Sequence, residues 1–277
     1  MTLKTSPFKS SSVPPPTAMS IAGSDSSGGA GIQADLKTFA AFGVYGTSVI
    51  TAITAQNTQG VTGMLEIPKD LVRAQIDAVI SDIGANAVKT GMLPSVELIT
   101  LVADTIKSLD LQNIVVDPVM VAKGGDRLLK EDAIETLRTK LLPLATIITP
   151  NIPEAETLTG IEISNLEDSS NAAKMIVNMG AASVIVKGGH LVDNEAIDLF
   201  YDGKNFRKFR SPRIETKNTH GTGCTFSSAI AAGLARGLKL TDAIGGAKEY
   251  VTEAIRTNLN IGHGHGPLNH FYRLQDT

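Results

Sequence analysis

The sequence predicts an α/β fold in which helices cover both faces of a mostly parallel β-sheet. Short apolar stretches typical of buried strands alternate with longer amphipathic stretches typical of helices. Polar and glycine-rich turns follow one predicted strand after another. The chain has 277 residues, 42% of them hydrophobic, and a single cysteine, so it can bury a large core but cannot form an internal disulfide.

Residues 1–17 are predicted to form a disordered tail before one domain at residues 18–277. The tail is rich in Ser, Thr and Pro, and its three consecutive prolines favour an extended, solvated backbone. It lacks the apolar block of a secretory signal and the arginines of a transit peptide. No internal repeat and no linker follows it, which is why we expect a single domain.

The first half of the domain is predicted to begin with a strand at residues 18–22 and a helix at residues 31–42. In that helix Ile32, Leu36 and Phe39 share one face. We expect Pro94 to occupy the first turn of a later helix, a position that suits proline. The further predicted elements are strands at 48–53, 87–89 and 114–116 and helices at 71–83 and 94–109.

In the second half, a strand at residues 197–201 and another at 206–209, joined by Asp202 and Gly203, predict a hairpin near an edge of the sheet. Gly180 is expected to end the helix predicted at residues 171–179. The other predicted elements are helices at 130–142, 153–158, 171–179, 222–238 and 241–259 and strands at 146–148 and 183–186.

Polar residues gather where the predicted strands end. In an open parallel sheet these ends lie at one edge, where such folds bind ligands, so the pattern predicts a ligand cleft there. The candidate residues that these turns supply are Gly23, Asp25, Ala30, Gln56, Met92, Asp117, Asn151, Glu154 and Lys187.

The strongest single motif is His-Gly-Thr-Gly-Cys-Thr at residues 220–225, directly before a helix of small residues. Gly221, Thr222 and Gly223 at a helix start leave backbone N–H groups free to bind an anion, although a tight turn alone would also explain the glycines. Cys224 lies in the first turn, where the helix dipole favours a thiolate. A small buried side chain is the alternative role for this cysteine.

Three charged residues at strand ends are candidates for binding a nucleotide and a metal ion. Lys187 can neutralise phosphate charge, although a solvated loop lysine is the alternative. Asp117 and Glu154 can bind Mg²⁺, which prefers few carboxylates together with phosphate oxygens. An acid early in a helix, as Glu154 is predicted to be, also stabilises the helix dipole.

Several classes of function are disfavoured. Neither a dinucleotide-binding G-x-G-x-x-G motif nor a P-loop occurs. The net charge of −3 and the aromatic content of 4% give no support for nucleic-acid binding. No run of residues is apolar enough to span a membrane. We expect the histidine-rich segment 262–267 to be a glycine-shaped turn, because its spacing matches no zinc site.

Taken together, these motifs resemble the hydroxymethylpyrimidine/phosphomethylpyrimidine kinase family, which belongs to the ribokinase-like superfamily. The resemblance extends in order from about Met19 to His270, so only the tail lies outside it. It is carried by residues 22–37, 51–58, 89–92, 117–120, 149–156, 187–190, 220–225 and 262–267.

The resemblance implies a ribokinase-like three-layer αβα sandwich with a mostly parallel central sheet. It implies ATP-dependent phosphorylation of 4-amino-5-hydroxymethyl-2-methylpyrimidine and then of its monophosphate, with Mg²⁺, in thiamine biosynthesis. It also implies a cytoplasmic homodimer. A pyridoxal kinase of the same fold and a non-catalytic pyrimidine- or nucleotide-binding protein are the alternatives, and intact Lys187, Glu154 and Cys224 argue against the second.

The resemblance also implies roles for individual residues. Gln56 matches the family's pyrimidine-binding glutamine, and Lys187 matches a phosphate-binding lysine. Cys224 lies where many sugar kinases of the superfamily carry an aspartate base. The remaining matches are Gly23, Ala30, Met92 and Val119 at the pyrimidine pocket and Asn151 with Glu154 in the element that binds Mg²⁺. We also expect Asp25 to contact the substrate, Thr222 the nucleotide, and the amides of Gly221–Cys224 the transferring phosphoryl group.

Overall fold

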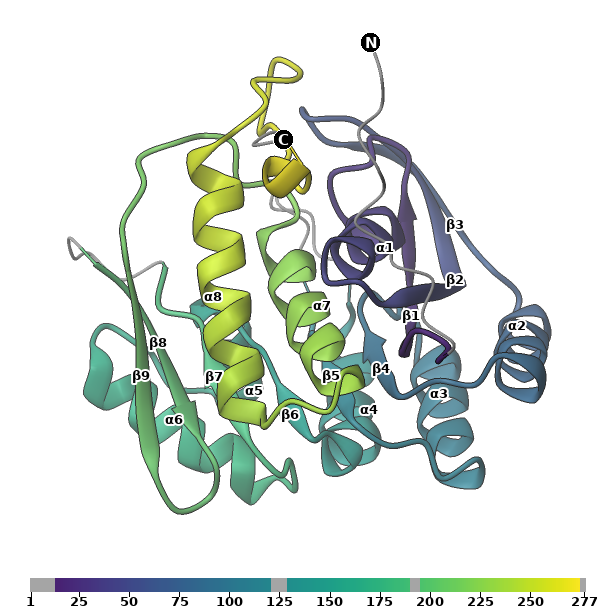
Figure 1. Cartoon of the computed structure of the whole chain (residues 1–277). Coiled ribbons are helices and arrows are strands. Elements are labelled where there is room, and N and C mark those ends of the chain that lie inside the picture. Colours follow the sequence, from purple (N-terminus) through teal and green to yellow (C-terminus); the bar gives the residue numbers. More distant parts are fainter. Residues whose placement is uncertain (1–12, 121–128, 190–194, 275–277) are drawn as a thin grey trace, which may run out of the picture.

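One mixed sheet organises the protein, with strand order β3-β2-β1-β4-β5-β6-β7-β8-β9 (Figure 1). The computed structural model of the chain describes residues 13–120, 129–189 and 195–274. The strands are β1 (Thr17–Asp25), β2 (Tyr45–Gln56), β3 (Val61–Glu66), β4 (Ala87–Thr90), β5 (Ile114–Val116), β6 (Ile147–Ile148), β7 (Val184–Val186), β8 (Glu195–Tyr201) and β9 (Phe206–Pro212). Strands β3, β8 and β9 pair antiparallel with their neighbours, and the other pairs are parallel.

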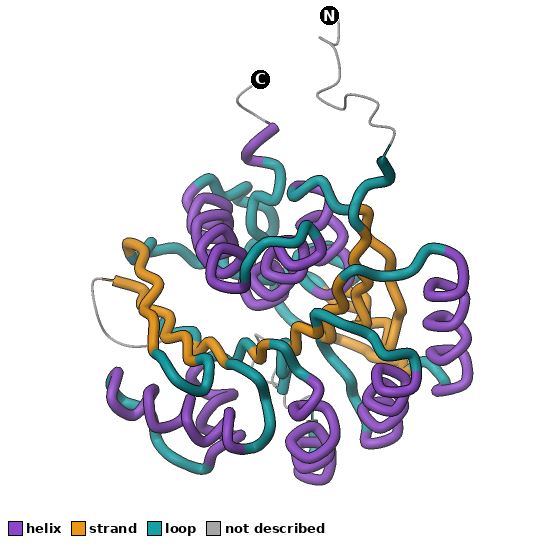
Figure 2. The backbone as a smooth tube through the Cα atoms, turned by 60° about the horizontal axis from the view of Figure 1, so that its bottom comes forward, coloured by secondary structure: helices purple, strands orange, loops and turns teal. Residues whose placement is uncertain are grey.

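Helices cover both faces of this sheet, as the tube in Figure 2 shows. Helices α1, α7 and α8 pack on one face, and α2–α6 lie on the other. The helices are α1 (Gly31–Ala41), α2 (Lys69–Asp82), α3 (Val96–Ser108), α4 (Glu131–Thr136), α5 (Ile152–Thr159), α6 (Leu166–Asn178), α7 (Thr222–Ala235) and α8 (Leu240–Arg256). This is the three-layer αβα sandwich that the sequence predicts.

Side-chain alternation along the central strands produces the two halves of the core. Val115 packs in the cluster with α1, α7 and α8, whereas Ile114 and Val116 pack in the cluster with α2–α6. Successive residues of a strand point to opposite faces, so an entirely apolar strand is stable only between two layers of helices. The strands β4–β7 are buried at every position, which the alternation of short apolar runs predicts.

The predicted elements are largely confirmed, with four main differences. The helix predicted at residues 130–142 is an α-helix only over Glu131–Thr136 and continues as a π-helix over Leu137–Leu141. Strand β3 was not predicted, because its residues are almost all exposed and therefore carry no apolar signal. Helix α6 begins at Leu166, before the predicted start at residue 171, because Asn165 caps a first turn that is polar. Pro94 does not lie in the first turn of α3, since the side chain of Ser95 caps that helix and accepts the N–H of Leu98.

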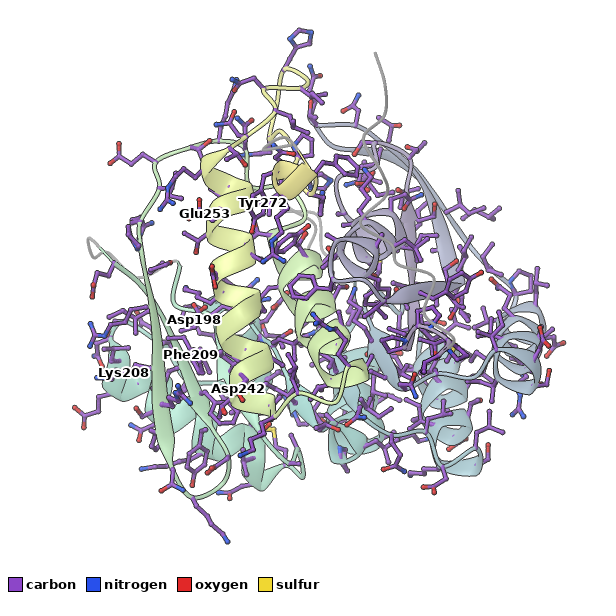
Figure 3. The ribbon with its side chains drawn as sticks, in the orientation of Figure 1. Asp198, Lys208, Phe209, Asp242, Glu253 and Tyr272 are labelled. Atoms are coloured by element: carbon purple, nitrogen blue, oxygen red, sulfur yellow. The ribbon has the colours of Figure 1, made fainter. Side chains whose placement is uncertain are left out.

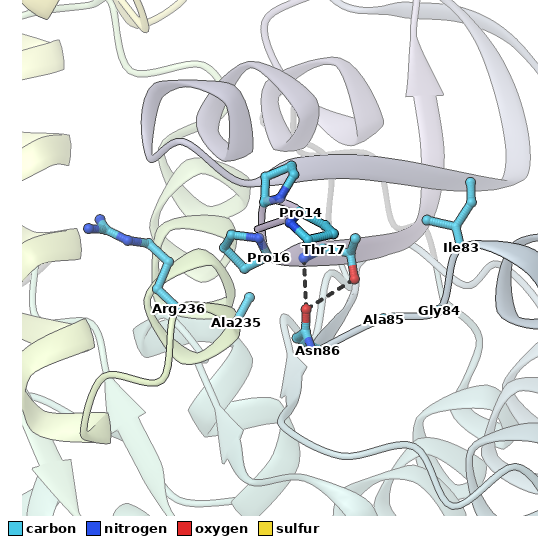
Figure 4. Close-up of a pocket in the computed structure, with 10 residues that line it drawn as sticks. Pro14, Pro16, Thr17, Ile83, Gly84, Ala85, Asn86, Ala235 and Arg236 are labelled. Atoms are coloured by element: carbon cyan, nitrogen blue, oxygen red, sulfur yellow. Dashed lines mark hydrogen bonds between the residues drawn. The ribbon is translucent and has the colours of Figure 1, made fainter. Parts of the chain in front are cut away.

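The predicted tail meets the sheet at Thr17, which already belongs to β1. Residues 1–12 lie outside the described part of the chain. Thr17 donates its backbone N–H to Asn86 Oδ1 over 2.9 Å, and Pro14 and Pro16 lie beside it against Ala235 and Arg236 (Figure 4). This contact places the start of the domain at the end of β1 that is opposite to the predicted cleft.

Candidate active site

A cavity of about 790 Å³ opens at the carboxyl ends of the parallel strands. All the site residues that the sequence predicts line it, although they come from turns far apart in the chain. They are Gly23, Asp25, Ala30, Gln56, Met92, Asp117, Val119, Asn151, Glu154, Lys187, Gly221, Thr222, Gly223 and Cys224. The structure therefore brings the predicted residues into one place, at the sheet edge where α/β proteins bind ligands.

The N-terminus of α7 forms the centre of the cavity. Gly221 caps the helix with a φ of 81°, in the left-handed region that favours glycine. A Cβ at Gly221 would collide with the backbone oxygen of Gly29, and a Cβ at Gly29 would collide with the ring of His220. Two glycine-rich turns therefore touch backbone to backbone, which directs the first-turn amides of α7 into the cavity.

Asp25 and His220 join the same two turns through their side chains. His220 Nε2 lies 2.8 Å from Asp25 Oδ2, and both side chains are buried. Asp25 also accepts the backbone N–H groups of Ser27 and Ala30. Burial alone would raise the pKa of Asp25, but the hydrogen bonds from His220, Ser27 and Ala30 outweigh it and lower the pKa to about 2. The carboxylate of Asp25 thus holds the two turns together from within the cavity wall.

Lys187 lies between two buried carboxylates beside the start of α7. Its Nζ is 3.3 Å from Asp117 Oδ1 and would be 3.2 Å from a Cβ on Gly223. Burial would lower the pKa of Lys187, but the charges of Asp117 and Glu154 outweigh it and raise the pKa. This ammonium and the first-turn amides of α7 point to one region, which suits an anion such as a phosphate.

Glu154 and Asn151 form a capping box at the start of α5. The Asn151 side chain accepts the N–H of Glu154 over 2.9 Å, and Glu154 Oε2 accepts the N–H of Asn151 over 2.8 Å. Burial raises the pKa of Glu154 to about 7, with Asp117 adding to the rise and Lys187 opposing it. Glu154 therefore has the helix-capping role, and it also lines the cavity.

The residues Asp117 and Glu154 fit a magnesium ion that is held mainly by its nucleotide. The described residues contain no group of three or more His, Cys, Asp or Glu side chains that could hold a metal by themselves. Mg²⁺ needs only one or two carboxylates when phosphate oxygens and water complete its shell. The negative charge of Asp117 disfavours ionisation of Glu154, so the carboxylate of Glu154 would gain from such a cation.

The structure corrects the predicted state of Cys224. We expected the helix start to lower the pKa of this thiol, but burial raises it to about 11. The positive charge of Lys89 and the backbone N–H of Gly31 oppose the rise without cancelling it. Desolvation therefore exceeds the helix dipole at this position, and the free thiol is the resting form near neutral pH.

Gln56 lies at the side of the cavity formed by the ends of β1 and β2. Its Oε1 accepts the hydroxyl of Thr54 over 3.0 Å, and its Nε2 is 3.4 Å from His220 Nε2. Next to it Gly23 packs so tightly on Met92 that a Cβ would collide with the methionine methyl group. A pocket lined by an amide and by apolar side chains suits a flat, polar heterocycle.

Several cavity residues carry no clear signal in the sequence. On β8, Asp198 accepts the backbone N–H of Gly188 over 3.0 Å and pairs with Lys248 of α8 over 2.8 Å; Figure 3 shows Asp198 beside that helix. This pair fixes the turn that carries Lys187. Lys89 was noted only as part of a motif, although a lysine inside a strand that is otherwise buried is itself a sign of a charged partner.

The histidine-rich segment is a glycine-shaped turn, as expected. Gly262 has a φ of 81°, and a Cβ on Gly264 would collide with the backbone of Thr58. His265 donates its backbone N–H to the Thr58 oxygen over 2.8 Å.

Within the described residues, no helix is long and apolar enough to cross a membrane.

Comparison with known proteins identifies the family. Residues 25–269 match the phosphomethylpyrimidine kinase family. The chain belongs to this family. The hydroxymethylpyrimidine/phosphomethylpyrimidine kinase of Rhizobium meliloti is 54% identical over 259 residues, which cover 92% of this chain and 97% of that protein. The thiamine biosynthesis bifunctional protein ThiED of Geobacter sulfurreducens is 53% identical over 93% of this chain, which spans 53% of that longer protein.

Solved structures of this kinase family and of pyridoxal kinases share the fold. An ADP complex of Bacillus subtilis pyridoxal kinase has a TM-score of 0.88 and 42% identity and covers 95% of this chain and 100% of that one. Phosphomethylpyrimidine kinase from Clostridium difficile 630 has a TM-score of 0.77 and 48% identity, with 86% of this chain and 99% of that chain covered. The predicted family and ribokinase-like fold are thereby confirmed.

Replacing Gly221 by alanine is expected to destabilise the kinase far more than the same change at Gly237. Both glycines have a positive φ, 81° and 77°, so alanine strains both backbones. Only at Gly221 does the new Cβ collide with another backbone, whereas nothing lies within 4 Å at Gly237. Urea unfolding should show an additional loss of about 2 kcal/mol for Gly221→Ala, as overpacking costs. Equal losses would contradict the close contact of the two turns.

The carboxylate of Asp25 is expected to stabilise the folded kinase only above about pH 4. Its pKa falls from about 4 in the unfolded chain to about 2 in the folded protein, so its contribution is lost as the pH falls between these values. Unfolding free energies of the wild type and Asp25→Asn should therefore differ by about 2 kcal/mol at pH 6. The difference should shrink toward pH 3, and a gap that does not depend on pH would refute this role.

Proposed function

We propose that this kinase transfers the γ-phosphoryl group of ATP to 4-amino-5-hydroxymethyl-2-methylpyrimidine and then to the resulting monophosphate, as in thiamine biosynthesis. The observation that carries the proposal is the position of Lys187 at the first turn of α7, beside Cys224 and in the same cavity as Gln56 and Met92. An anion site therefore adjoins a pocket for a flat, polar heterocycle. Structures of Staphylococcus aureus pyridoxal kinase with ADP and with AMP-PCP support ATP as the phosphoryl donor.

Lys187 and the amides of Gly221, Gly223 and Cys224 would stabilise the transferring phosphoryl group. Phosphoryl transfer requires alignment and charge neutralisation more than covalent participation of the protein. The amides are fixed by the contact of Gly221 with Gly29, so they need no reorganisation during the reaction. Asp117 and Glu154 would hold Mg²⁺, which supplies positive charge to the phosphate oxygens when bound. Thr222 and Asn151, which line the same cavity, would contact the nucleotide.

Cys224 would act as the general base in the first phosphorylation. The thiol of Cys224 would first lose its own proton to solvent. The thiolate then takes the proton of the hydroxymethyl group while that oxygen forms a bond to the γ-phosphorus. The bond between the γ-phosphorus and the bridging oxygen breaks, and ADP leaves with the electron pair. In the second phosphorylation the acceptor is already an anionic phosphate, so no base is required.

Replacing Cys224 by alanine is therefore expected to slow the first phosphorylation by about a hundredfold and the second by much less. Cys224→Ser should behave in the same way, because a hydroxyl is a far weaker acid than a thiol and does not supply the anionic base. Lys187→Met should instead slow both steps, since both transfer the same phosphoryl group. The kcat of each step, measured separately from the alcohol and from the monophosphate, distinguishes these cases. Equal losses in both steps for Cys224→Ala would remove the base from the mechanism.

Pyridoxal phosphorylation is the second candidate function, because the Bacillus subtilis pyridoxal kinase shares this fold and is 42% identical to this chain. One panel separates the two functions. The protein is incubated with Mg-ATP and the pyrimidine alcohol, its monophosphate or pyridoxal, and the products are identified by mass. We expect the pyrimidine monophosphate and pyrophosphate to form at higher kcat/KM than pyridoxal phosphate. Failure to convert either pyrimidine compound would overturn the proposal.

The remaining proposals concern organisation and compartment. We propose that the tail predicted at residues 1–17 ends one residue earlier, because Thr17 belongs to β1, and that one kinase domain follows it. We also propose a homodimer, which the exposed apolar side chains of Ile53, Met64 and Leu65 on β2 and β3 support. A cytoplasmic location would keep the thiol of Cys224 reduced, as a general base requires.

A further inference from the structure

A buried ion pair lies beneath the active site. Lys89 Nζ is 2.9 Å from Asp35 Oδ2 and 3.1 Å from Asp35 Oδ1, and neither side chain is exposed to solvent. Asp35 also accepts the hydroxyl of Ser20 over 2.5 Å and that of Ser228 over 2.6 Å. These four residues belong to β4, α1, β1 and α7, so the network joins two neighbouring strands to the two helices that pack on them.

The same network lies next to Cys224. Ser228 follows Cys224 by four positions on α7, so the two side chains share one face of that helix. Lys89 and Cys224 both line the cavity. A Cβ on Gly91, at the cavity end of β4, would be 2.7 Å from Lys89 Nζ, which shows that the ammonium turns toward this end of the strand.

Stability alone does not account for this pair. Removing two charges from water costs several kcal/mol per ion, and their attraction often fails to exceed that cost. Apolar side chains of similar size would fill the space with less desolvation. A lysine that remains charged at the floor of a catalytic cavity is therefore a candidate for a functional role.

We propose that Lys89 is a positioning residue which stabilises the thiolate of Cys224, and that Asp35, held by Ser20 and Ser228, fixes the ammonium at the distance this requires. The catalytic consequence rests on the proposed function, whereas the electrostatic effect on the thiol does not. During the first phosphorylation the nearby ammonium would lower the free energy of the thiolate form that accepts the alcohol proton.

The charges around Cys224 support this assignment. Lys89 on β4 and Asp35 on α1 face it with opposite charges, Asp117 after β5 adds a negative charge, and Lys187 after β7 is also coupled to it. Burial raises the pKa of the Cys224 thiol; Lys89 lowers that pKa, and Asp35 raises it. Burial would lower the pKa of Lys89, but the charges of Asp35, Cys224 and Asp117 and the hydrogen bond to Asp35 together outweigh it and raise the pKa, so its ammonium persists.

The test uses the fact that Cys224 is the only cysteine of the chain. The rate of alkylation of the protein by iodoacetamide, followed by mass across a range of pH, reports the thiol pKa without any substrate. Asp35→Asn removes the negative charge and keeps the lysine, whereas Lys89→Met combined with Asp35→Asn removes both without leaving an unpaired buried carboxylate. Lys107→Met, which removes an exposed lysine of α3, is the control for net charge.

We expect the thiol pKa of Asp35→Asn to lie below that of the wild type. The thiol pKa of the double variant should be at least one unit higher than that of Asp35→Asn. This means about tenfold slower alkylation at pH values below both of these thiol pKa values. Lys107→Met should titrate like the wild type. Coincident titration curves for Asp35→Asn and the double variant would overturn the proposal.

Two further measurements keep the test decisive. Should the double variant fail to fold by circular dichroism, a thiol pKa of Asp35→Asn that is equal to or above the wild-type value would overturn the proposal by itself. In the folded double variant, kcat for the first phosphorylation should fall at least tenfold relative to Asp35→Asn, with KM for the pyrimidine unchanged. A thiol pKa that shifts as expected without this fall would contradict the base role of Cys224 and leave the electrostatic role of Lys89 intact.

Discussion

The contact between two glycine-rich turns determines the geometry of the active site. Gly221 can approach the backbone oxygen of Gly29 only because neither turn carries a side chain there. This contact sets where α7 begins, and hence where its first-turn amides, Cys224 and the ammonium of Lys187 meet. Asp25 and His220 hold the same turns together by a buried contact of 2.8 Å between their side chains. The proposed anion site is thus assembled from residues far apart in the chain rather than within one loop.

Burial then determines how each charged group in the cavity behaves. Desolvation alone would favour the neutral forms of Lys187 and Lys89, but each ammonium lies beside a carboxylate and keeps its charge. Cys224 is different, because burial exceeds the opposing effect of Lys89 and favours the thiol. In its proposed role as a base, Cys224 would depend on nearby cations to stabilise its thiolate. Under the proposed mechanism, the buried ammonium of Lys89 would stabilise the thiolate, and the ammonium of Lys187 would neutralise the charge of the phosphate.

Elements that are buried in the core could be predicted from the sequence more accurately than elements that are exposed or stabilised by a cap. Strands β4–β7 were predicted within a residue or so at each end, because their apolar runs reflect burial on both faces. Strand β3 was missed, since it pairs with β2 at the edge and exposes nearly all its side chains. The start of α6 was placed too late, because its first turn is stabilised by the Asn165 cap rather than by packing. The candidate site residues line one cavity because they lie in turns whose position at one sheet edge follows from the parallel topology.

The sequence alone determined the α/β class, the edge of the sheet that carries the site, and the residue types that line it. These properties follow from local periodicity and from the order of strands and turns. Only the tertiary structure decided the partners and the ionisation of those residues. Asp25 and His220 are 195 positions apart, and Asp35 and Ser228 are 193 apart, so no local pattern relates them. Their burial, and with it the direction of the pKa of Cys224, depends on which distant groups the fold packs against each side chain.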